Sequence, residues 1–237
     1  MNPIYKFELR TYRNSPVTYV FAGLFFMICA IYFFIDNIRG RSGDMTSFYN
    51  SMSIILLFML PVFTARTISD DRKSGFEMLL ITSPVSILRI ILGKFWAVMN
   101  IILAMLASTV VFPLFLSLFA HLSVRTLLIR YAGLILLSAS IVALGIFISS
   151  LTESQVAAAI ISLIALLILF VARPIGTAIG GKPAKVIAGF SVFSRFSTMN
   201  EGVFTVGTVV YDISFIFVFL FLTIQTMELR RLHGGGK

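Results

Sequence analysis

Six long apolar runs, separated by short polar segments, divide this chain of 237 residues. Each run is long enough for a helix of about 20 residues to cross a bilayer, and none shows the alternation of a barrel strand. Because backbone groups inside a bilayer must be hydrogen-bonded internally, such runs predict helices. The predicted spans are residues 16–36, 48–68, 87–119, 127–151, 155–172 and 209–227. The pattern therefore predicts an all-α integral membrane protein with one membrane domain over residues 1–237.

Three of these runs contain features that predict details of helix shape and packing. The third run is longer than a bilayer requires, so its start is expected to project from the membrane. Pro61 and Pro113 lie inside the second and third runs and predict kinks. Gly145 in the fourth run has no side chain and predicts a close approach of a neighbouring helix.

The composition supports the membrane assignment and narrows the class of protein. The chain is 58% hydrophobic and 12% charged, with a mean hydropathy of +0.99, whereas a soluble domain has about a quarter of charged residues. The formal net charge is +9. In a membrane protein such a charge indicates lipid headgroups rather than nucleic acid as the contact. The single cysteine, Cys29, excludes an intrachain disulfide and a cysteine-rich metal site.

The basic residues that flank the runs predict the orientation of the chain. Lys6, Arg10 and Arg13 precede the first span, and Lys and Arg are enriched on the cytoplasmic side. An even number of spans then places both termini in the cytoplasm. The longest connection, residues 173–208, falls outside, where its apolar clusters predict a short re-entrant or interfacial helix.

Each candidate catalytic or cofactor motif in this sequence lacks a residue or a geometry that its chemistry needs. Residues 176–183, GTAIGGKP, have the spacing of a phosphate-binding loop, but Pro183 lacks the hydroxyl and the amide that such a loop uses. Asp70 and Asp71 are neighbours whose side chains point about 100° apart on a helix, so they do not converge on one substrate. His121 and His233 belong to no metal or triad motif. The sequence predicts no catalytic, cofactor or metal site, and therefore no enzyme activity of the chain alone.

Residues 66–86, RTISDDRKSGFEMLLITSPVS, concentrate charge between the second and third spans. Phe76, Leu79 and Leu80 recur at helical spacing and predict one apolar face of a short helix, with Glu77 beside it and Pro84 where the helix should stop. The residues alone leave two interpretations open. The helix either rests on the membrane surface or presents an apolar ridge with a charged rim to the groove of a cytosolic partner.

The motif R-x3-D-D-R-K-S-G-F-E-M-L-L-I-T-S-P-V-S, followed by I-L-G-K-F-W-A, resembles the inner segment of ABC transporter type-2 permeases. It is most similar to the group that includes the gliding-motility permease subunit. Residues 149–155 and 193–212 also agree with that group. Aspartates at 70 and 71 replace the usual glutamates, and Phe76 replaces the usual threonine.

The resemblance implies a permease subunit of an ATP-driven exporter in the bacterial plasma membrane. Such a subunit pairs with a second permease, identical or different, and with two cytosolic ATPase subunits that bind ATP and Mg²⁺. The segment between spans two and three would be the coupling helix, Gly93 and Lys94 would mark the entry of span three, and a second inner loop would hold Thr152, Glu153 and Ser154. The implied docking residues are Asp70, Asp71, Arg72, Lys73, Gly75, Phe76, Glu77, Leu79, Leu80 and Pro84.

Two other functions stay open at this stage. One is a receptor-like or scaffold protein that uses the same docking segment without transport, and the other is a secondary carrier or channel. Ion-coupled carriers usually place ionisable groups deep in the bilayer, whereas Asp36, Arg130 and Asp212 fall near the ends of the predicted spans. The sequence indicates no particular substrate.

Overall fold

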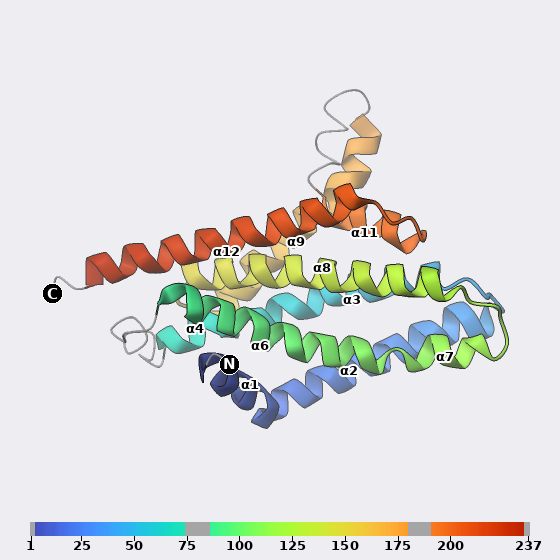
Figure 1. Ribbon diagram of the computed structural model, residues 1–237, viewed down its shortest axis with the longest axis horizontal. Helices are drawn as coiled ribbons and strands as arrows, with labels where there is room; N and C mark the ends of the chain where they lie inside the picture. The colour runs from blue at the N-terminus through green and yellow to red at the C-terminus, as the bar shows by residue number, and fades with distance from the viewer. Residues whose placement is uncertain (1–2, 74–85, 180–190, 235–237) are drawn as a thin grey trace.

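The computed structural model describes residues 3–73, 86–179 and 191–234, and within these ranges all regular structure is helical. Most helices run along the long axis of the molecule (Figure 1). Both termini and α4 lie at one end, called the terminal end below, and the connections 40–45 and 118–123 lie at the opposite end. The helices are α1 (Pro3–Asn14), α2 (Pro16–Phe33), η1 (Phe34–Arg39), α3 (Thr46–Thr64), α4 (Arg66–Lys73), α6 (Ile87–Ser108), α7 (Val111–Ser117), α8 (Val124–Leu151), α9 (Gln155–Ile179), α11 (Val192–Asn200) and α12 (Val206–Gly234).

Six helical segments are long and apolar enough to cross a membrane, and they confirm the six predicted runs. The chain is therefore a multi-pass membrane protein. The structure lengthens the predicted first and last spans by a few residues, because η1 continues α2 and the last helix begins earlier. The six segments are Pro16–Arg39, Thr46–Ser69, Ile87–Ser117, Val124–Leu151, Gln155–Ala172 and Val206–Arg231.

The third predicted span is not one continuous helix, because α6 and α7 meet at a turn over Thr109 and Val110. Pro113 accounts for its position, since proline lacks an amide hydrogen and its ring clashes with the carbonyl four residues before it. That carbonyl belongs to Thr109, and it accepts a hydrogen bond from the Phe112 amide at 3.1 Å instead. The kink predicted at Pro113 is thus present as a break.

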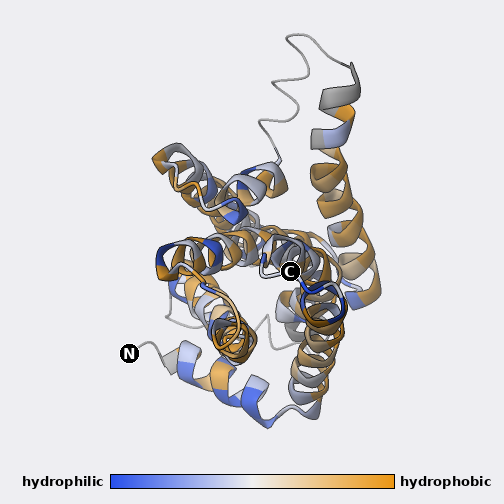
Figure 2. Cartoon of the chain, turned by 90° about the vertical axis from the view of Figure 1, so that its right-hand side faces the viewer, coloured by the Kyte–Doolittle hydropathy of each residue, from blue (hydrophilic) through white to orange (hydrophobic). Residues whose placement is uncertain are grey.

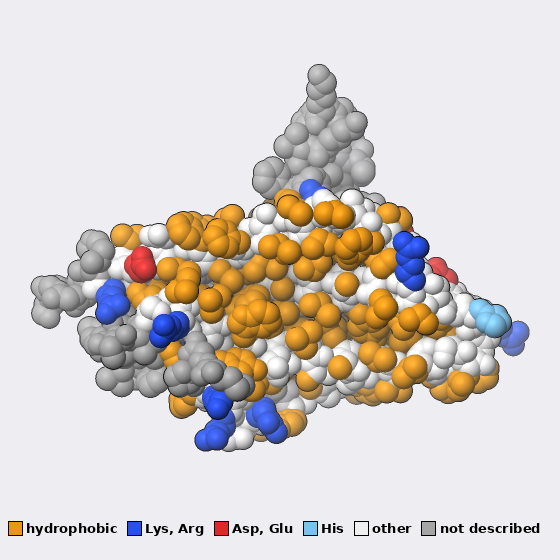
Figure 3. Space-filling view, viewed as in Figure 1, with side chains coloured by type: hydrophobic (Ala, Val, Ile, Leu, Met, Phe, Trp, Pro, Cys, Tyr) orange, Lys and Arg blue, Asp and Glu red, His pale blue; other side chains and the backbone are white. Residues whose placement is uncertain are grey.

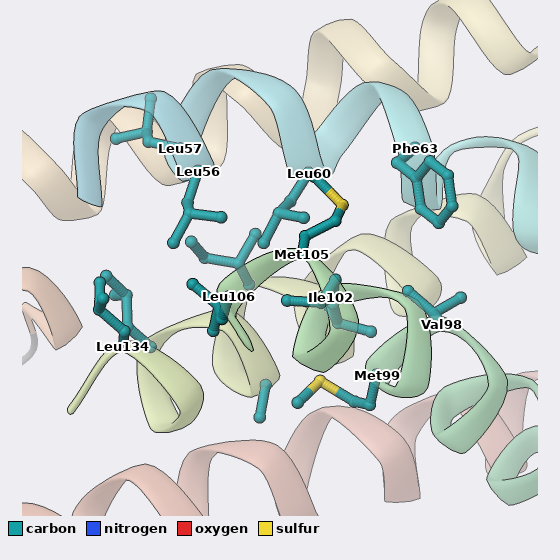
Figure 4. Packing of buried hydrophobic residues seen from close by; sticks show 14 of the residues in the cluster. Leu56, Leu57, Leu60, Phe63, Val98, Met99, Ile102, Met105, Leu106 and Leu134 are labelled. Atoms are coloured by element: carbon teal, nitrogen blue, oxygen red, sulfur yellow. The ribbon is translucent and has the colours of Figure 1, made fainter. Parts of the chain in front are cut away.

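The centre of the protein is α8, which packs against α3, α6, α9, α11 and α12. In its most apolar stretch 78% of the residues of α8 are buried, against 17% of those of α9, which leans away from the other helices towards its C-terminal end (Figures 1 and 2). Between α3, α6 and α8 the core is filled by leucine, isoleucine and methionine side chains, among them Leu60, Ile102 and Leu134 (Figure 4).

The outer surface separates into an apolar middle and charged ends. Figure 3 shows a broad band of apolar side chains across the middle of one face, with Lys and Arg near the ends and over α1. Helix α1 itself was not predicted. It is largely hydrophilic, unlike the helices it precedes (Figure 2), and it packs closely against α6. The polar N-terminal flank is therefore an ordered element of the fold.

Candidate functional site

The terminal end holds the described part of the predicted docking segment. Helix α4 carries the backbone of Asp70, Asp71, Arg72 and Lys73 as its last turn, and α6 begins at Ile87 after an extended Ser86. The second span therefore leads, after a turn at Ala65, into the charged cluster as helix α4. The predicted ridge and its flanks lie outside the described residues, so the amphipathic helix stays a prediction. The residues concerned are Gly75, Phe76, Glu77, Leu79, Leu80 and Pro84.

The start of α4 is capped by a side chain from α8. The first amides of any helix lack partners within it and are usually satisfied by a Ser, Thr, Asp or Asn at the N-cap. Here the N-cap position is Ala65, which has no hydroxyl. The hydroxyl of Ser149 accepts hydrogen bonds from the amides of Ile68 and Ser69 at 3.2 and 3.1 Å and donates to the Ala65 carbonyl at 2.9 Å. The break between α3 and α4 is thus held by α8.

A glycine brings the same two segments into close contact. A Cβ atom on Gly145 of α8 would lie 2.2 Å from Oγ1 of Thr64, the last residue of α3. No ordinary side chain fits at that distance, so only glycine permits this approach. The close helix contact predicted from Gly145 is confirmed, and it seats the α3–α4 junction directly against α8.

Lys94 joins three elements at the terminal end. Its side chain is almost fully buried in α6, and its ammonium group donates to Glu8 Oε1 of α1 at 2.5 Å and to the Thr67 carbonyl of α4 at 2.9 Å. The hydroxyls of Tyr12 and Thr67 add a second link between α1 and α4 at 3.3 Å. A cavity of about 150 Å³ borders these groups. Buried charges persist only when paired, so this ion pair fixes α1 against α6.

The position of Lys94 refines the sequence interpretation. Gly93 and Lys94 were expected where span three enters the membrane, and the structure places both, buried, about two turns inside α6. The partner Glu8 was missed, although it is the only acidic residue before Asp36 and stands among basic ones. That isolation was a usable signal. The resemblance covers Ser149, the first residue of 149–155, but it gave this serine no role.

The second predicted inner loop lies at the terminal end as well. Thr152, Glu153 and Ser154 connect α8 to α9 and directly follow the turn of α8 that caps α4. The Thr152 hydroxyl donates to the Ile148 carbonyl at 3.1 Å, which closes the end of α8. Glu153 and Ser154 are exposed. The fold thus brings together α4, the start of α6 and this loop, three regions that the sequence singled out separately.

The opposite end is fastened by Arg130, which was expected only as a charge near a span end. Its guanidinium is mostly buried and donates to the Asn200 carbonyl at 2.9 Å, to the Thr46 hydroxyl at 2.8 Å and to Asp44 Oδ1 at 3.3 Å. It also lies 5.4 Å from the centre of the Tyr49 ring. Arg130 therefore joins α8 to the start of α3 and the end of α11.

Asp44 lies outside the membrane-spanning segments, and its neighbours in this cluster change the pKa of its carboxyl group. Partial desolvation raises its pKa, but hydrogen bonds from the hydroxyl and amide of Thr46, and from Arg130, outweigh that effect. The net result is a pKa below the ordinary value of 3.8. Asp44 is therefore charged at neutral pH and acts as a partner for Arg130.

Two further features lie within the last predicted connection and the last span. Helix α11 occupies part of the connection and buries Phe193, Phe196 and Met199, although a re-entrant path for this segment stays a prediction. Asp212 is 3% exposed, and the Arg195 guanidinium lies 4.0 Å from the ring centre of its neighbour Tyr211. Asp212 is thus buried inside the protein, near the start of the last span.

The side chains described above link one helix to another. Among the described residues, no three His, Cys, Asp or Glu side chains gather in a way that could hold a metal ion. No protein-family model and no curated protein matches this chain. The terminal end remains the best candidate site, because α4 is joined there to α1, α6 and α8 through specific buried groups.

Proposed function

We propose that this chain is the permease subunit of an ATP-driven ABC exporter. With a second permease subunit it would form the path across the membrane, and two cytosolic ATPase subunits would dock at the terminal end. Both termini would then face the cytoplasm of a bacterial cell. The proposal is supported by the resemblance of residues 66–86 and 91–97 to type-2 permeases and by the six membrane helices.

The observation that carries this proposal is the way in which α4 is fastened. This helix leads directly into the segment proposed to dock the ATPase. Ser149 joins its first turn to α8, and Lys94 joins the Thr67 carbonyl to α6 and, through Glu8, to α1. A displacement of the docking segment would therefore reach three helices through short buried contacts. A permease that obtains work from another subunit needs such a connection.

The exposed loop of Glu153 and Ser154 offers a second place for contact with the ATPase. Glu153 lies four residues after Ser149, whose hydroxyl caps α4. An ATPase that docks on the segment after α4 would therefore meet this loop on the same side of the membrane. Two separate contacts would fix the orientation of the ATPase as well as its position.

The test is to purify the tagged full chain from its native membranes in a mild detergent and to measure ATP turnover. We expect a copurifying polypeptide with a complete phosphate-binding loop and ATP hydrolysis that depends on it. Glu77→Arg and Leu79→Asp should remove both, because like charges at an interface cost several kcal/mol and every 1.4 kcal/mol is about tenfold in affinity. Arg41→Glu, a charge reversal at the opposite end, is the matched control.

Three outcomes would contradict the proposal. Stoichiometric ATP binding by the isolated chain would show that it carries its own nucleotide site. A wild-type preparation without ATP turnover would favour the scaffold or carrier functions. Full assembly and turnover of both variants would exclude the segment as the docking site.

The orientation is tested separately with a single cysteine at position 74 in a Cys29→Ser background. We expect this cysteine to resist an impermeant reagent added outside intact cells and to react in inverted vesicles. A cysteine at position 41 should show the reverse pattern. Labelling of position 74 from outside would place the terminal end on the wrong side for a cytosolic ATPase.

A further inference from the structure

The outward face of α1 carries a groove rich in positive charge, called the basic groove below. Lys6, Arg10 and Arg13 line it together with Tyr5 of the same helix and Tyr19 of α2, and its volume is about 590 Å³. The three basic residues are spaced by four and by three positions, which places them on one face of a helix. All three are exposed.

These three charges are available to a ligand. Across the described residues, no acidic side chain forms an ion pair with Lys6, Arg10 or Arg13. The one carboxylate of α1, Glu8, lies on the opposite face and is paired with Lys94 of α6. The packing of α1 thus separates its charges, with the negative one buried and the three positive ones outside.

The basic groove lies beside the start of a membrane span. Only Ser15 separates α1 from α2, whose first residue, Pro16, begins the first segment able to cross the membrane. Tyr19 sits in the first turn of that span and is 65% exposed. Tyrosine and basic residues at the end of a span are typical of the headgroup layer. The groove is therefore at the depth of lipid headgroups.

An exposed apolar stripe on α2 begins next to Tyr19. Val20, Leu24, Met27 and Ile31 recur at helical spacing and are 61%, 44%, 55% and 49% exposed. A ligand with an anionic head and long apolar chains would place the head in the basic groove and the chains along this stripe. Free phosphate would use only the first of these two surfaces.

We propose that the basic groove binds the anionic headgroup of a phospholipid whose acyl chains lie along α2. The site holds the headgroup against α1, and α1 is fixed to α6 and α4 through Lys94. A bound lipid would therefore contact the element that stabilises the terminal end. This inference does not depend on the proposed transport function, because it concerns only the lipid that surrounds the chain.

The test compares lipids that differ only in the headgroup. The full chain, purified in detergent, is mixed with equal amounts of phosphatidylglycerol and phosphatidylcholine of identical acyl chains, and the retained lipids are counted by native mass spectrometry. We expect a clear preference of the wild type for phosphatidylglycerol. Each basic residue near a membrane surface contributes about fivefold to such binding. Arg10→Gln should thus lower the preference about fivefold, and Lys6→Gln/Arg10→Gln/Arg13→Gln should abolish it.

The matched control removes three charges from the opposite end, as Arg39→Gln/Arg41→Gln/Arg125→Gln, and should keep the preference. An equal loss in this control would reduce the effect to net charge and overturn the proposal. Displacement of the lipid by an excess of inorganic phosphate would assign the groove to free anions instead. A wild type without preference, or an Arg10→Gln variant that keeps it in full, would also overturn the proposal, and the single variant removes no buried contact that folding requires.

Discussion

Replacing Lys94 by methionine should destabilise the whole terminal end. The substitution keeps the length of the side chain but leaves the Glu8 carboxylate buried without its partner at 2.5 Å and removes the hydrogen bond to the Thr67 carbonyl. The two side chains are only 3% and 10% exposed, so the contacts that are lost are buried ones. Breaking a buried ion pair costs about 3–5 kcal/mol, and the hydrogen bond contributes about 1 kcal/mol more.

The double variant Lys94→Met/Glu8→Leu tests the cause of that loss. Because it removes both charges, it should recover most of the stability, since an apolar pair of similar size often equals a buried ion pair. Unfolding in mixed micelles can be followed by the fluorescence of Trp96, the only tryptophan, which lies two residues beyond Lys94. Lys6→Met, on the exposed face of α1, is the control and should change stability by less than about 0.5 kcal/mol.

Two results would refute this reasoning. If Lys94→Met unfolds at the same denaturant concentration as the wild type, the ion pair does not stabilise the terminal end. If the double variant is as unstable as Lys94→Met, the cost comes from packing around the lysine stem and not from an unpaired carboxylate.

Three further predictions follow from single contacts. Gly145→Ala should cost about 1–3 kcal/mol of unfolding free energy by overpacking, whereas Gly23→Ala, whose new Cβ meets nothing within 4 Å, should be neutral or stabilising. Ser149→Ala should lower the free energy of unfolding by about 1 kcal/mol through loss of the helix cap. Ser138→Ala is the control and should lower it less, because the Ser138 hydroxyl bonds only its own helix. Equal losses of stability in the two variants would disprove the capping role of Ser149. The pKa of Asp44 is lowered from 3.8 in the folded protein. The charged carboxylate should therefore stabilise the fold above about pH 4, and this stabilisation should vanish as the pH falls through the lower folded-state pKa. Asp44→Asn should remove this pH-dependent contribution when unfolding is measured across an acid titration.

The sequence predicted the membrane helices well, because a bilayer imposes one requirement on every span. Residues 87–119 and 127–151 are predominantly apolar, although they contain Lys94 and Arg130, and hydropathy alone located them. Pro113 even indicated the break before α7. The same method missed α1, because its outer face is polar and its inner face includes an ion pair with a residue 86 positions away.

The candidate site was predictable in outline and not in its contacts. Charge density located α4, and the resemblance located Gly93, Lys94 and the loop at 152–154, but no local pattern shows which residues meet across the fold. The resemblance implied that Lys94 marks the entry of span three, and a lone lysine would be costly further inside a bilayer. Glu8 lifts that restriction, since a paired charge is tolerated where a lone one is not. Arg130 was expected near a span end, where it lies, but its partners Asp44, Thr46 and Asn200 come from other parts of the chain and were not foreseen.

The cap that Ser149 provides for α4 has a consequence for hydrogen exchange. The amide hydrogens of Ile68 and Ser69 are bonded to a side chain of another helix. Their exchange with deuterium should become faster when α8 moves away from α4, even while α4 itself stays helical. Their exchange rates would therefore report how often the two helices separate at this junction.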